Sequence, residues 1–370
     1  MSVHVPANRS EMLLIIAGSG RMLAEAARQA GFRVLVLDLY ADLDTRLHAV
    51  EFFRVPSLAI GHVAPVLDDL IERYGVAQVI YGSGLEAHPE TLDYLNHHVT
   101  ILGNTPAVFR GLQNKVEFFA TLGALNIPFP EVSFTAPDTG CDWLVKPMQG
   151  QGGLGIRRHN ANCVIDSCAY WQKFQLGTAG SVLFLADTRG ARVIGFNTQF
   201  TAKLNTGLEF AFSGLINHST LSRRQKALIS GWLTRCVQAF ALKGLNSLDF
   251  IQHGEQVHVL EINPRPSASM QLYGHLLTRH IEVCRGSLPD ALPKQKSFAG
   301  FRVVYADADL RIPDAFHWPD WARDRSEPGA VCRPGQPVCS IIARRSEPRQ
   351  VLAALAARQQ QIFNQLIKVQ

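Results

Sequence analysis

The sequence predicts a mixed α/β and α+β protein that begins with an αβα domain built on a parallel sheet. An apolar strand at 12–17, an Ala-rich helix at 21–30 and a second apolar strand at 33–37 form one βαβ unit, and such units place their strands in parallel. Strands expected at 181–186 and 192–200 are joined by a short Asp/Gly turn, which favours antiparallel pairing. A parallel domain is therefore expected first, with a partly antiparallel region after it.

Hydrophobic spacing and turn residues predict the remaining elements. The first ten residues are expected to lack regular structure, and Thr105 is expected to cap a helix. Further helices are predicted at 63–74, 89–96, 116–125, 222–242 and 348–368, and further strands at 78–81, 100–102, 142–147, 169–175, 246–251, 257–263, 298–305 and 338–342.

The composition is that of a globular protein of two or three domains, because 47% of the 370 residues are hydrophobic and 18% are charged. The net charge of +5 is not gathered into a Lys/Arg block, so we expect an anionic small ligand and no nucleic acid. No apolar run approaches the ~20 residues of a membrane span. The seven cysteines contain no CxxC pair, and we expect reduced thiols in a cytoplasmic protein.

A Gly-rich turn follows the first strand. Gly18-Ser19-Gly20 with Asp38 at the end of the next strand is typical of dinucleotide-binding enzymes, but Leu23 stands where their third glycine would be. We therefore favour a generic αβα domain with a tight turn over an oxidoreductase.

A second Gly-rich turn, Gly82-Ser83-Gly84, follows the strand at 78–81. Loops at the carboxyl ends of parallel strands line ligand crevices. Glu86 and His88, which come directly after it, are therefore either substrate contacts or ordinary turn residues.

A third glycine cluster lies between basic residues. Lys146 is at the end of a strand, four of the six residues at 150–155 are glycine, and Arg157 follows. Glycines expose backbone N–H groups that can wrap phosphate oxygens. The segment is not a P-loop, because no GK[ST] closes it and no helix follows. A flexible linker is the alternative, but the flanking basic residues favour a phosphate-binding flap.

Two acidic residues are expected to face each other on a hairpin. The strands at 246–251 and 257–263 are joined by a short turn that contains Gly254, which brings Asp249 near Glu261. Each carboxylate alone has an equally good interpretation as a solubilising charge on an edge strand.

The residues that follow Glu261 strengthen the interpretation as a site. Strand alternation puts Asn263 on the same face as Glu261 and directs Leu260 and Ile262 into the core. Arg265, two residues after Asn263, is expected on the face of Glu261 and Asn263. Carboxylate and amide oxygens suit Mg²⁺, and arginine binds anions with two parallel hydrogen bonds. Together they predict a metal–phosphate site.

The order of these motifs resembles the ATP-grasp superfamily, and within it the ATP-dependent carboligases related to biotin carboxylase. The resemblance covers about residues 12–286. It implies a pre-ATP-grasp domain at 1–110, an ATP-grasp domain at 111–295 with an ATP lobe at about 111–190 and a metal lobe at about 191–295, and a small C-terminal β/α extension at 296–370.

The resemblance assigns the nucleotide contacts. Lys115 and Lys146 match lysines that contact the phosphates of ATP. The glycines that match the flap over the phosphates are Gly150, Gly152, Gly153 and Gly155. Where relatives carry an acid that meets adenine and ribose, this chain has Leu176, and Gln172 or Gln175 takes that role instead.

The resemblance also assigns the metal site and the phosphoryl contact. Asp249, Glu261 and Asn263 match the ligands of Mg²⁺, with Mn²⁺ as the other suitable ion. Arg265 matches the arginine that faces the transferred phosphoryl group and, with Lys146, has the catalytic role.

The implied reaction is ATP-dependent ligation. A substrate carboxylate becomes an acyl-phosphate with release of ADP, and an amine or similar nucleophile then displaces phosphate. The resemblance extends to cofactor biosynthesis with a one-carbon-carrier, furan or pterin compound, and it allows a homodimer. The alternatives are a biotin-carboxylase-like carboxylation and an ATP-binding sensor without turnover. An intact acid pair together with Arg265 argues against the sensor.

Overall fold

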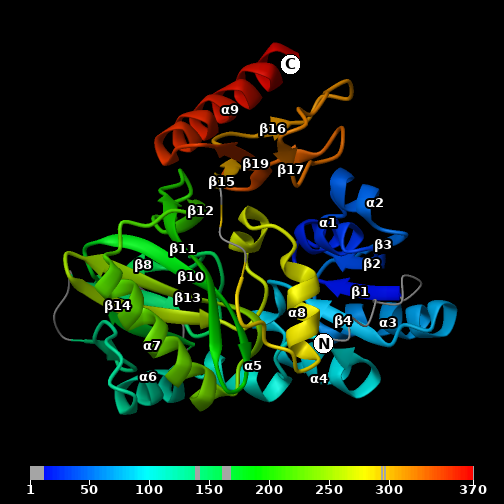
Figure 1. The fold of residues 1–370 in the computed structure, drawn as a ribbon. Helices are drawn as coiled ribbons and strands as arrows, with labels where there is room; N and C mark the ends of the chain where they lie inside the picture. Colours follow the sequence, from blue (N-terminus) through cyan, green and yellow to red (C-terminus); the bar gives the residue numbers. More distant parts are fainter. Residues whose placement is uncertain (1–11, 138–141, 161–167, 293–294, 296, 370) are drawn as a thin grey trace.

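The computed structural model describes residues 12–137, 142–160, 168–292, 295 and 297–369. The expectation for the first ten residues lies outside this part of the chain. Five parallel strands form the first sheet in the order β3-β2-β1-β4-β5, which confirms the parallel αβα domain (Figure 1). Its strands are β1 Met12–Ile16, β2 Arg33–Asp38, β3 Glu51–Arg54, β4 Gln78–Tyr81 and β5 Thr100–Ile101. Its helices are α1 Arg21–Gln29, α2 Leu43–His48, α3 Ile60–Tyr74, η1 Leu85–Ala87, α4 Pro89–His98 and α5 Pro106–Gln113.

The larger part of the chain is organised around eight antiparallel strands in the order β14-β13-β10-β11-β12-β15-β19-β17. Since β15, β17 and β19 come from the last quarter of the chain, the C-terminal extension continues this sheet. The strands are β10 Thr178–Asp187, β11 Ala191–Ala202, β12 Ala211–Ile216, β13 Lys243–His253, β14 Gln256–Asn263, β15 Phe298–Tyr305, β17 Ala322–Arg323 and β19 Pro337–Arg345.

A smaller four-stranded sheet, in the order β6-β9-β7-β8, carries the glycine cluster between β7 and β8. These strands are β6 Val132–Ser133, β7 Trp143–Pro147, β8 Arg157–Arg158 and β9 Ala169–Lys173, and the pair β16 Leu310–Arg311 and β18 Val331–Cys332 is separate. The helices of this larger part are α6 Lys115–Ala124, α7 Arg223–Phe240, η2 Ala268–Leu272, α8 Leu276–Cys284 and α9 Pro348–Val369.

Local sequence explains the helix boundaries that the site depends on. Ser222 and Gln225 form a capping box at the start of α7, and Ala241 ends that helix in the left-handed conformation. Thr105 caps α5 as predicted, and Asn114 caps α6. Helix α6 therefore begins at a lysine whose position is fixed by its cap.

A β-bulge in the acidic hairpin corrects one prediction. Asp249 pairs with Glu261, but the next residue, Phe250, pairs with Val259, so Leu260 is the extra residue. Val259 and Ile262 are core residues, whereas Leu260 is only half-buried and belongs to no core cluster. The prediction that Leu260 points into the core is wrong, because the bulge reverses the alternation there. Without it, Glu261 would share the core face with Val259.

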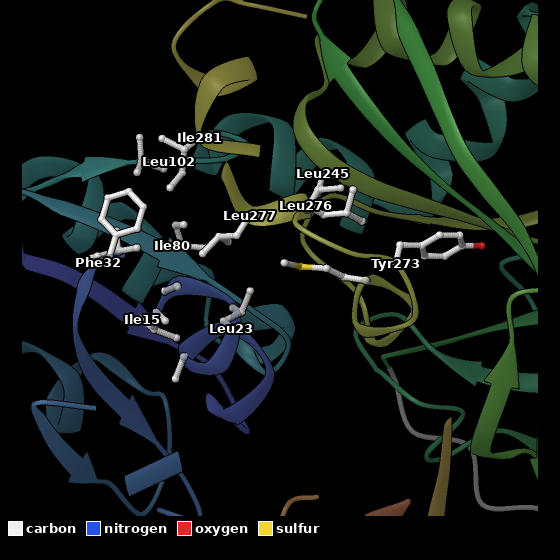
Figure 2. Packing of buried hydrophobic residues seen from close by; sticks show 14 of the residues in the cluster. Ile15, Leu23, Phe32, Ile80, Leu102, Leu245, Tyr273, Leu276, Leu277 and Ile281 are labelled. Atoms are coloured by element: carbon white, nitrogen blue, oxygen red, sulfur yellow. The ribbon is translucent and has the colours of Figure 1, made fainter. Parts of the chain in front are cut away.

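One hydrophobic core joins the N-terminal domain to the rest of the chain. Figure 2 shows Leu23 and Ile80 of the first domain packed near Leu277 of α8, with Leu245 of β13 in the same cluster. The two parts are thus held by continuous apolar packing. No helix in the described residues has the length and apolarity that a bilayer crossing requires.

Candidate active site

The acidic hairpin places two carboxylates side by side. Asp249 on β13 is the direct register partner of Glu261 on β14. Asp249 accepts one hydrogen bond from Nε2 of Gln199 and one from Nδ2 of Asn263, each 3.2 Å long. Burial, and then the charge of Glu261, raises the pKa of Asp249 to about 8. In the absence of a cation, Asp249 therefore holds its proton to a higher pH than an ordinary carboxyl group does.

Arg265 connects this hairpin to the N-terminal domain. Its Nε donates to Oε1 of Glu86 at 2.6 Å, and both side chains are less than one-tenth exposed. Glu86 is itself fixed by the backbone N–H of Gly84 at 2.6 Å. Arg265 also donates to Oδ1 of Asn263 at 3.4 Å. Glu86 was expected to be either a substrate contact or a turn residue. The structure gives it a further role, which is to orient Arg265.

The two predicted lysines line the same cavity as Glu261. Lys115, the first residue of α6, is 7% exposed. Lys146 on β7 donates from Nζ to Oε1 of Gln172 at 3.1 Å. Burial lowers the pKa of Lys146, and the carboxylates of Glu261 and Asp249 oppose this effect.

One cavity brings these groups together. It has a volume of about 50 Å³ and is lined by both lysines, the glycine cluster and the acid Glu261. The residues around it are Lys115, Lys146, Pro147, Gly150, Gln151, Gly152, Gly153, Leu154, Ile156, Tyr170 and Glu261. Asp249, Asn263 and Arg265 connect to this group through the hairpin but do not line the cavity, and neither do Gly155, Gln172 and Gln175.

The glycine segment lies closed against β12. The carbonyl of Gly152 accepts a hydrogen bond from the N–H of Phe212 at 2.8 Å. A Cβ atom at Gly153 would lie 1.9 Å from the carbonyl oxygen of Phe210, so only glycine permits this contact. Small-molecule sites are typically 300–1,000 Å³, so the cavity beneath the closed segment is too small for a nucleotide. The segment must lift for one to enter, as a flap does.

Gln172 has an unsatisfied donor inside the site. It is 2% exposed, and its Nε2 is buried without a hydrogen-bond partner among the described residues. An orphaned donor beside Lys146 fits a ligand that supplies an acceptor there. Leu176, by contrast, is 68% exposed, and Gln175 is half-buried without a hydrogen bond in this part of the structure.

The donor set also fits a divalent cation bound together with phosphates. Mg²⁺ is usually held by one or two carboxylates plus substrate oxygens, and the hairpin offers Asp249 and Glu261 next to the cavity. The amide nitrogen of Asn263 faces Asp249, so this amide must turn before its oxygen can bind a metal. Within the described residues no cluster of three or more His, Cys, Asp or Glu has metal-ligand geometry.

Known proteins share this architecture. The model of the ATP-grasp domain family matches residues 112–269. Pyruvate carboxylase of Rhizobium etli superimposes with a TM-score of 0.74 at 14% identity, over 94% of this chain and 36% of that one. This chain therefore spans about a third of that enzyme's length.

Two further structures match over most of both chains. L-amino acid ligase of Bacillus licheniformis has a TM-score of 0.73 at 12% identity and covers 97% of this chain and 98% of its own. The biotin carboxylase domain of 2-oxoglutarate carboxylase from Hydrogenobacter thermophilus, solved with MgADP and bicarbonate, has a TM-score of 0.71 at 13% identity, covering 90% and 86%. These likenesses are in fold. The family match spans the lysines, the flap and the acidic hairpin, and residues 112–269 of this chain therefore form an ATP-grasp domain.

Proposed function

We propose that this protein is an ATP-dependent ligase that activates a substrate carboxylate as an acyl-phosphate and joins it to an amine. The observation that carries the proposal is the single cavity at which two buried lysines, the glycine flap and Glu261 meet. Positive side chains beside an acid pair that can hold a divalent cation suit the phosphates of ATP.

The reaction consists of two balanced displacements. A carboxylate oxygen of the substrate attacks the γ-phosphorus of ATP, the bond to the bridging β–γ oxygen breaks, and ADP leaves. The amine then attacks the acyl carbon, inorganic phosphate leaves with the bonding pair, and the amine loses a proton. Both steps need charge stabilisation and exclusion of water more than a protein nucleophile.

Residues of this chain have separate tasks in the proposal. Lys115 and Lys146 bind and orient phosphate oxygens, and the flap covers them with backbone N–H groups. Arg265, held by Glu86, binds the phosphoryl group in transfer. Asp249 and Glu261 would hold Mg²⁺, which when bound supplies charge that offsets the β- and γ-phosphates.

The narrower parts of the proposal have the family resemblance as their only support. They are a role in cofactor biosynthesis, with a one-carbon-carrier, furan or pterin compound as a substrate, assembly as a homodimer, and a cytoplasmic location. Carboxylation is the second candidate reaction, and the carboxylases named above as structural matches favour its inclusion in the test.

The test measures release of ADP, AMP and phosphate from Mg·ATP with pooled carboxylates, pooled amines, both pools, or bicarbonate. Wild type runs beside Glu261→Gln and the matched control Glu255→Gln. Glu255 carries the same charge in the exposed turn of the same hairpin, and its side chain makes no ion pair or hydrogen bond in the described structure.

ADP release that needs both pools, disappears in Glu261→Gln and persists in Glu255→Gln supports the ligase. Release that needs bicarbonate instead of a carboxylate would shift the assignment to carboxylation. AMP release would overturn the acyl-phosphate. Equal activity in wild type and Glu261→Gln would remove Glu261 from the metal site.

A further inference from the structure

The N-terminal domain holds the backbone that leads into Arg265, as well as its side chain. Strand β14 ends at Asn263, so Pro264 lies outside the strand ladder. Proline has no N–H, which leaves its carbonyl as its only polar backbone group. That carbonyl accepts from Nδ2 of Asn104 at 2.9 Å and from the hydroxyl of Tyr81 at 3.1 Å. Both donors belong to the N-terminal domain, and each is 1% exposed.

The amide of Asn104 uses both of its polar atoms. Its Oδ1 accepts the backbone N–H of Lys243 at 2.7 Å, and because an N–H can only donate, Nδ2 must face acceptors. Those acceptors are the carbonyl of Pro264 at 2.9 Å and Oδ1 of Asn246 at 2.8 Å. Asn246 is fully buried on β13, the strand that carries the first acid of the pair. One buried side chain therefore ties β13 to the end of β14.

Tyr81 supplies a second donor to the same carbonyl. Burial raises the pKa of its hydroxyl, so the hydroxyl keeps its proton and remains a donor. Its oxygen lies 3.1 Å from the carbonyl of Pro264 and 3.0 Å from the carbonyl of Asn104. Its one proton can serve only one of them at a time. Asn104 is therefore the constant anchor of Pro264, and Tyr81 is a shared one.

Fixing this carbonyl fixes the start of Arg265. The carbonyl of Pro264 and the N–H of Arg265 belong to one planar peptide unit, so holding the oxygen holds the plane from which Arg265 begins. Glu86 holds the other end of that side chain through Nε at 2.6 Å. Arg265 is thus held at its backbone and at its guanidinium by three residues of the N-terminal domain, which are Tyr81, Glu86 and Asn104.

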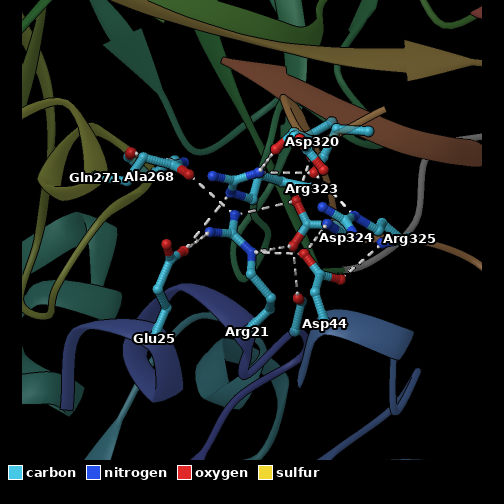
Figure 3. A network of polar contacts seen from close by, with 12 residues as sticks. Arg21, Glu25, Asp44, Ala268, Gln271, Asp320, Arg323, Asp324 and Arg325 are labelled. Atoms are coloured by element: carbon cyan, nitrogen blue, oxygen red, sulfur yellow. Dashed lines mark hydrogen bonds and ion pairs between the residues drawn. The ribbon is translucent and has the colours of Figure 1, made fainter. Parts of the chain in front are cut away.

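The far end of the same segment has an anchor of its own. Helix η2 begins at Ala268, four residues after Pro264. Its Gln271 accepts from Nη2 of Arg21 at 2.9 Å and donates to the carbonyl of Ala268 at 3.0 Å. Figure 3 shows Arg21 at the centre of this network. Because the network does not include Asn104, a change at Asn104 should release the Pro264 end of the segment alone.

We propose that Asn104 is a positioning residue for Arg265, which acts by holding the Pro264 carbonyl in the orientation that directs the guanidinium to the γ-phosphate. That Arg265 meets this phosphate rests on the ligase function proposed above. Misplacing a catalytic group by about 1 Å can cost about a hundredfold in rate, so an amide that touches no reacting atom can still limit the reaction. A purely structural role would lower stability and leave nucleotide discrimination intact.

Calorimetric titration with Mg·ADP and with the Mg complex of the non-hydrolysable β,γ-imido analogue of ATP tests this role without turnover. Only the analogue has a γ-phosphate for Arg265 to bind, so the alignment of Arg265 sets the preference of the protein for the triphosphate. Asn104→Asp keeps the acceptor for Lys243 but places a carboxylate oxygen against the carbonyl of Pro264. It should reduce the triphosphate preference about tenfold and leave the Mg·ADP affinity unchanged.

Asn217→Asp is the matched control. The Asn217 amide has the same bonding pattern, because its Oδ1 accepts the N–H of Ala299 at 2.7 Å and its Nδ2 donates to the carbonyl of Ser297 at 3.4 Å. It reaches β15 instead of the Arg265 segment, so Asn217→Asp should lose stability and keep the triphosphate preference. Tyr81→Phe removes a single hydroxyl, and this milder variant should reduce the preference about fivefold.

An equal triphosphate preference in wild type and Asn104→Asp overturns the positioning role, and so does an equal loss in Asn217→Asp. Adding Asn104→Asp to Arg265→Gln should cause no further loss, and a further loss would show that Asn104 does not act through Arg265. If Asn104→Asp does not fold, the preference of Tyr81→Phe against wild type decides the question. An Asn104-dependent preference in a protein that releases no ADP supports the positioning role and counts against the ligase. Glu261-dependent ligation that Asn104→Asp leaves unaltered does the reverse.

Discussion

The closed flap makes a sharp prediction about nucleotide entry. Gly152 and Gly153 are adjacent and both have positive φ, +62° and +74°. An added Cβ at Gly152 meets no atom within 4 Å, whereas at Gly153 it would lie 1.9 Å from the Phe210 carbonyl oxygen. Gly152→Ala therefore introduces only left-handed backbone strain, and Gly153→Ala introduces a similar strain plus a clash with Phe210, the residue before β12.

The clash should lift the flap from its resting position. Ordinary contact distances begin at 3.4 Å, so the segment must move by roughly 1.5 Å, which is enough to break the 2.8 Å bond from Phe212 to Gly152. Overpacking of this kind costs about 1–3 kcal/mol, and it destabilises the closed state alone. Because the cavity under the closed flap is only about 50 Å³, a larger open population should admit nucleotide faster.

Stopped-flow mixing of the protein with a fluorescent ADP derivative in the presence of Mg²⁺ measures this effect as an association rate. A shift of about 1.4 kcal/mol corresponds to a tenfold rate increase, so Gly153→Ala should bind about tenfold faster than Gly152→Ala. Thermal unfolding should show little change in either variant, because the flap is a surface segment. Association rates that agree within twofold between the two variants would refute the closed-flap reasoning.

Two further predictions concern the buried charges. Asp249 has a raised pKa in the folded, metal-free protein, so its contribution to stability is complete below the ordinary carboxyl pKa and is lost as pH rises through about 8. The unfolding free energy of wild type, measured with urea at pH 5–8, should therefore fall with pH more steeply than that of Asp249→Asn, by up to about 1.4 kcal/mol per pH unit. An identical slope in both proteins would contradict this. Glu86→Gln leaves the Arg265 guanidinium buried without a full counter-charge, a change that costs about 3–5 kcal/mol of stability in comparable pairs. Calorimetry should show almost unchanged Mg·ADP affinity, while ADP turnover should fall more than tenfold. Unaltered turnover would show that Arg265 needs no orientation by Glu86.

Local sequence was sufficient to predict the pairing of Asp249 with Glu261. A short Gly-containing turn specifies a hairpin, and the hairpin specifies the pairing. The face of Leu260 could not be predicted in the same way, because strict alternation cannot anticipate an extra residue. Here the inserted residue is what directs Glu261 away from the core, so the exception to the pattern creates the site.

Contacts between distant segments were beyond sequence reasoning. Glu86 and Arg265 are 179 positions apart, and the pair exists only because the N-terminal domain packs against the acidic hairpin. The bonds between Asp44 and the segment at Asp324 likewise join residues 280 positions apart. Each residue alone reads as a turn or surface charge, and only the tertiary fold gives it a partner.

The distribution of packing indicates which part of the site moves. Opening a hinge between the N-terminal and ATP-grasp domains would expose the shared apolar core and separate the buried pair of Arg265 and Glu86. The flap, in contrast, has mostly exposed or half-exposed residues, and one backbone hydrogen bond ties Gly152 to β12. Segments with few buried contacts open at the lowest free energy. Nucleotide entry should therefore depend on the flap, while the domain interface keeps Arg265 and the acid pair in a fixed relation throughout the reaction.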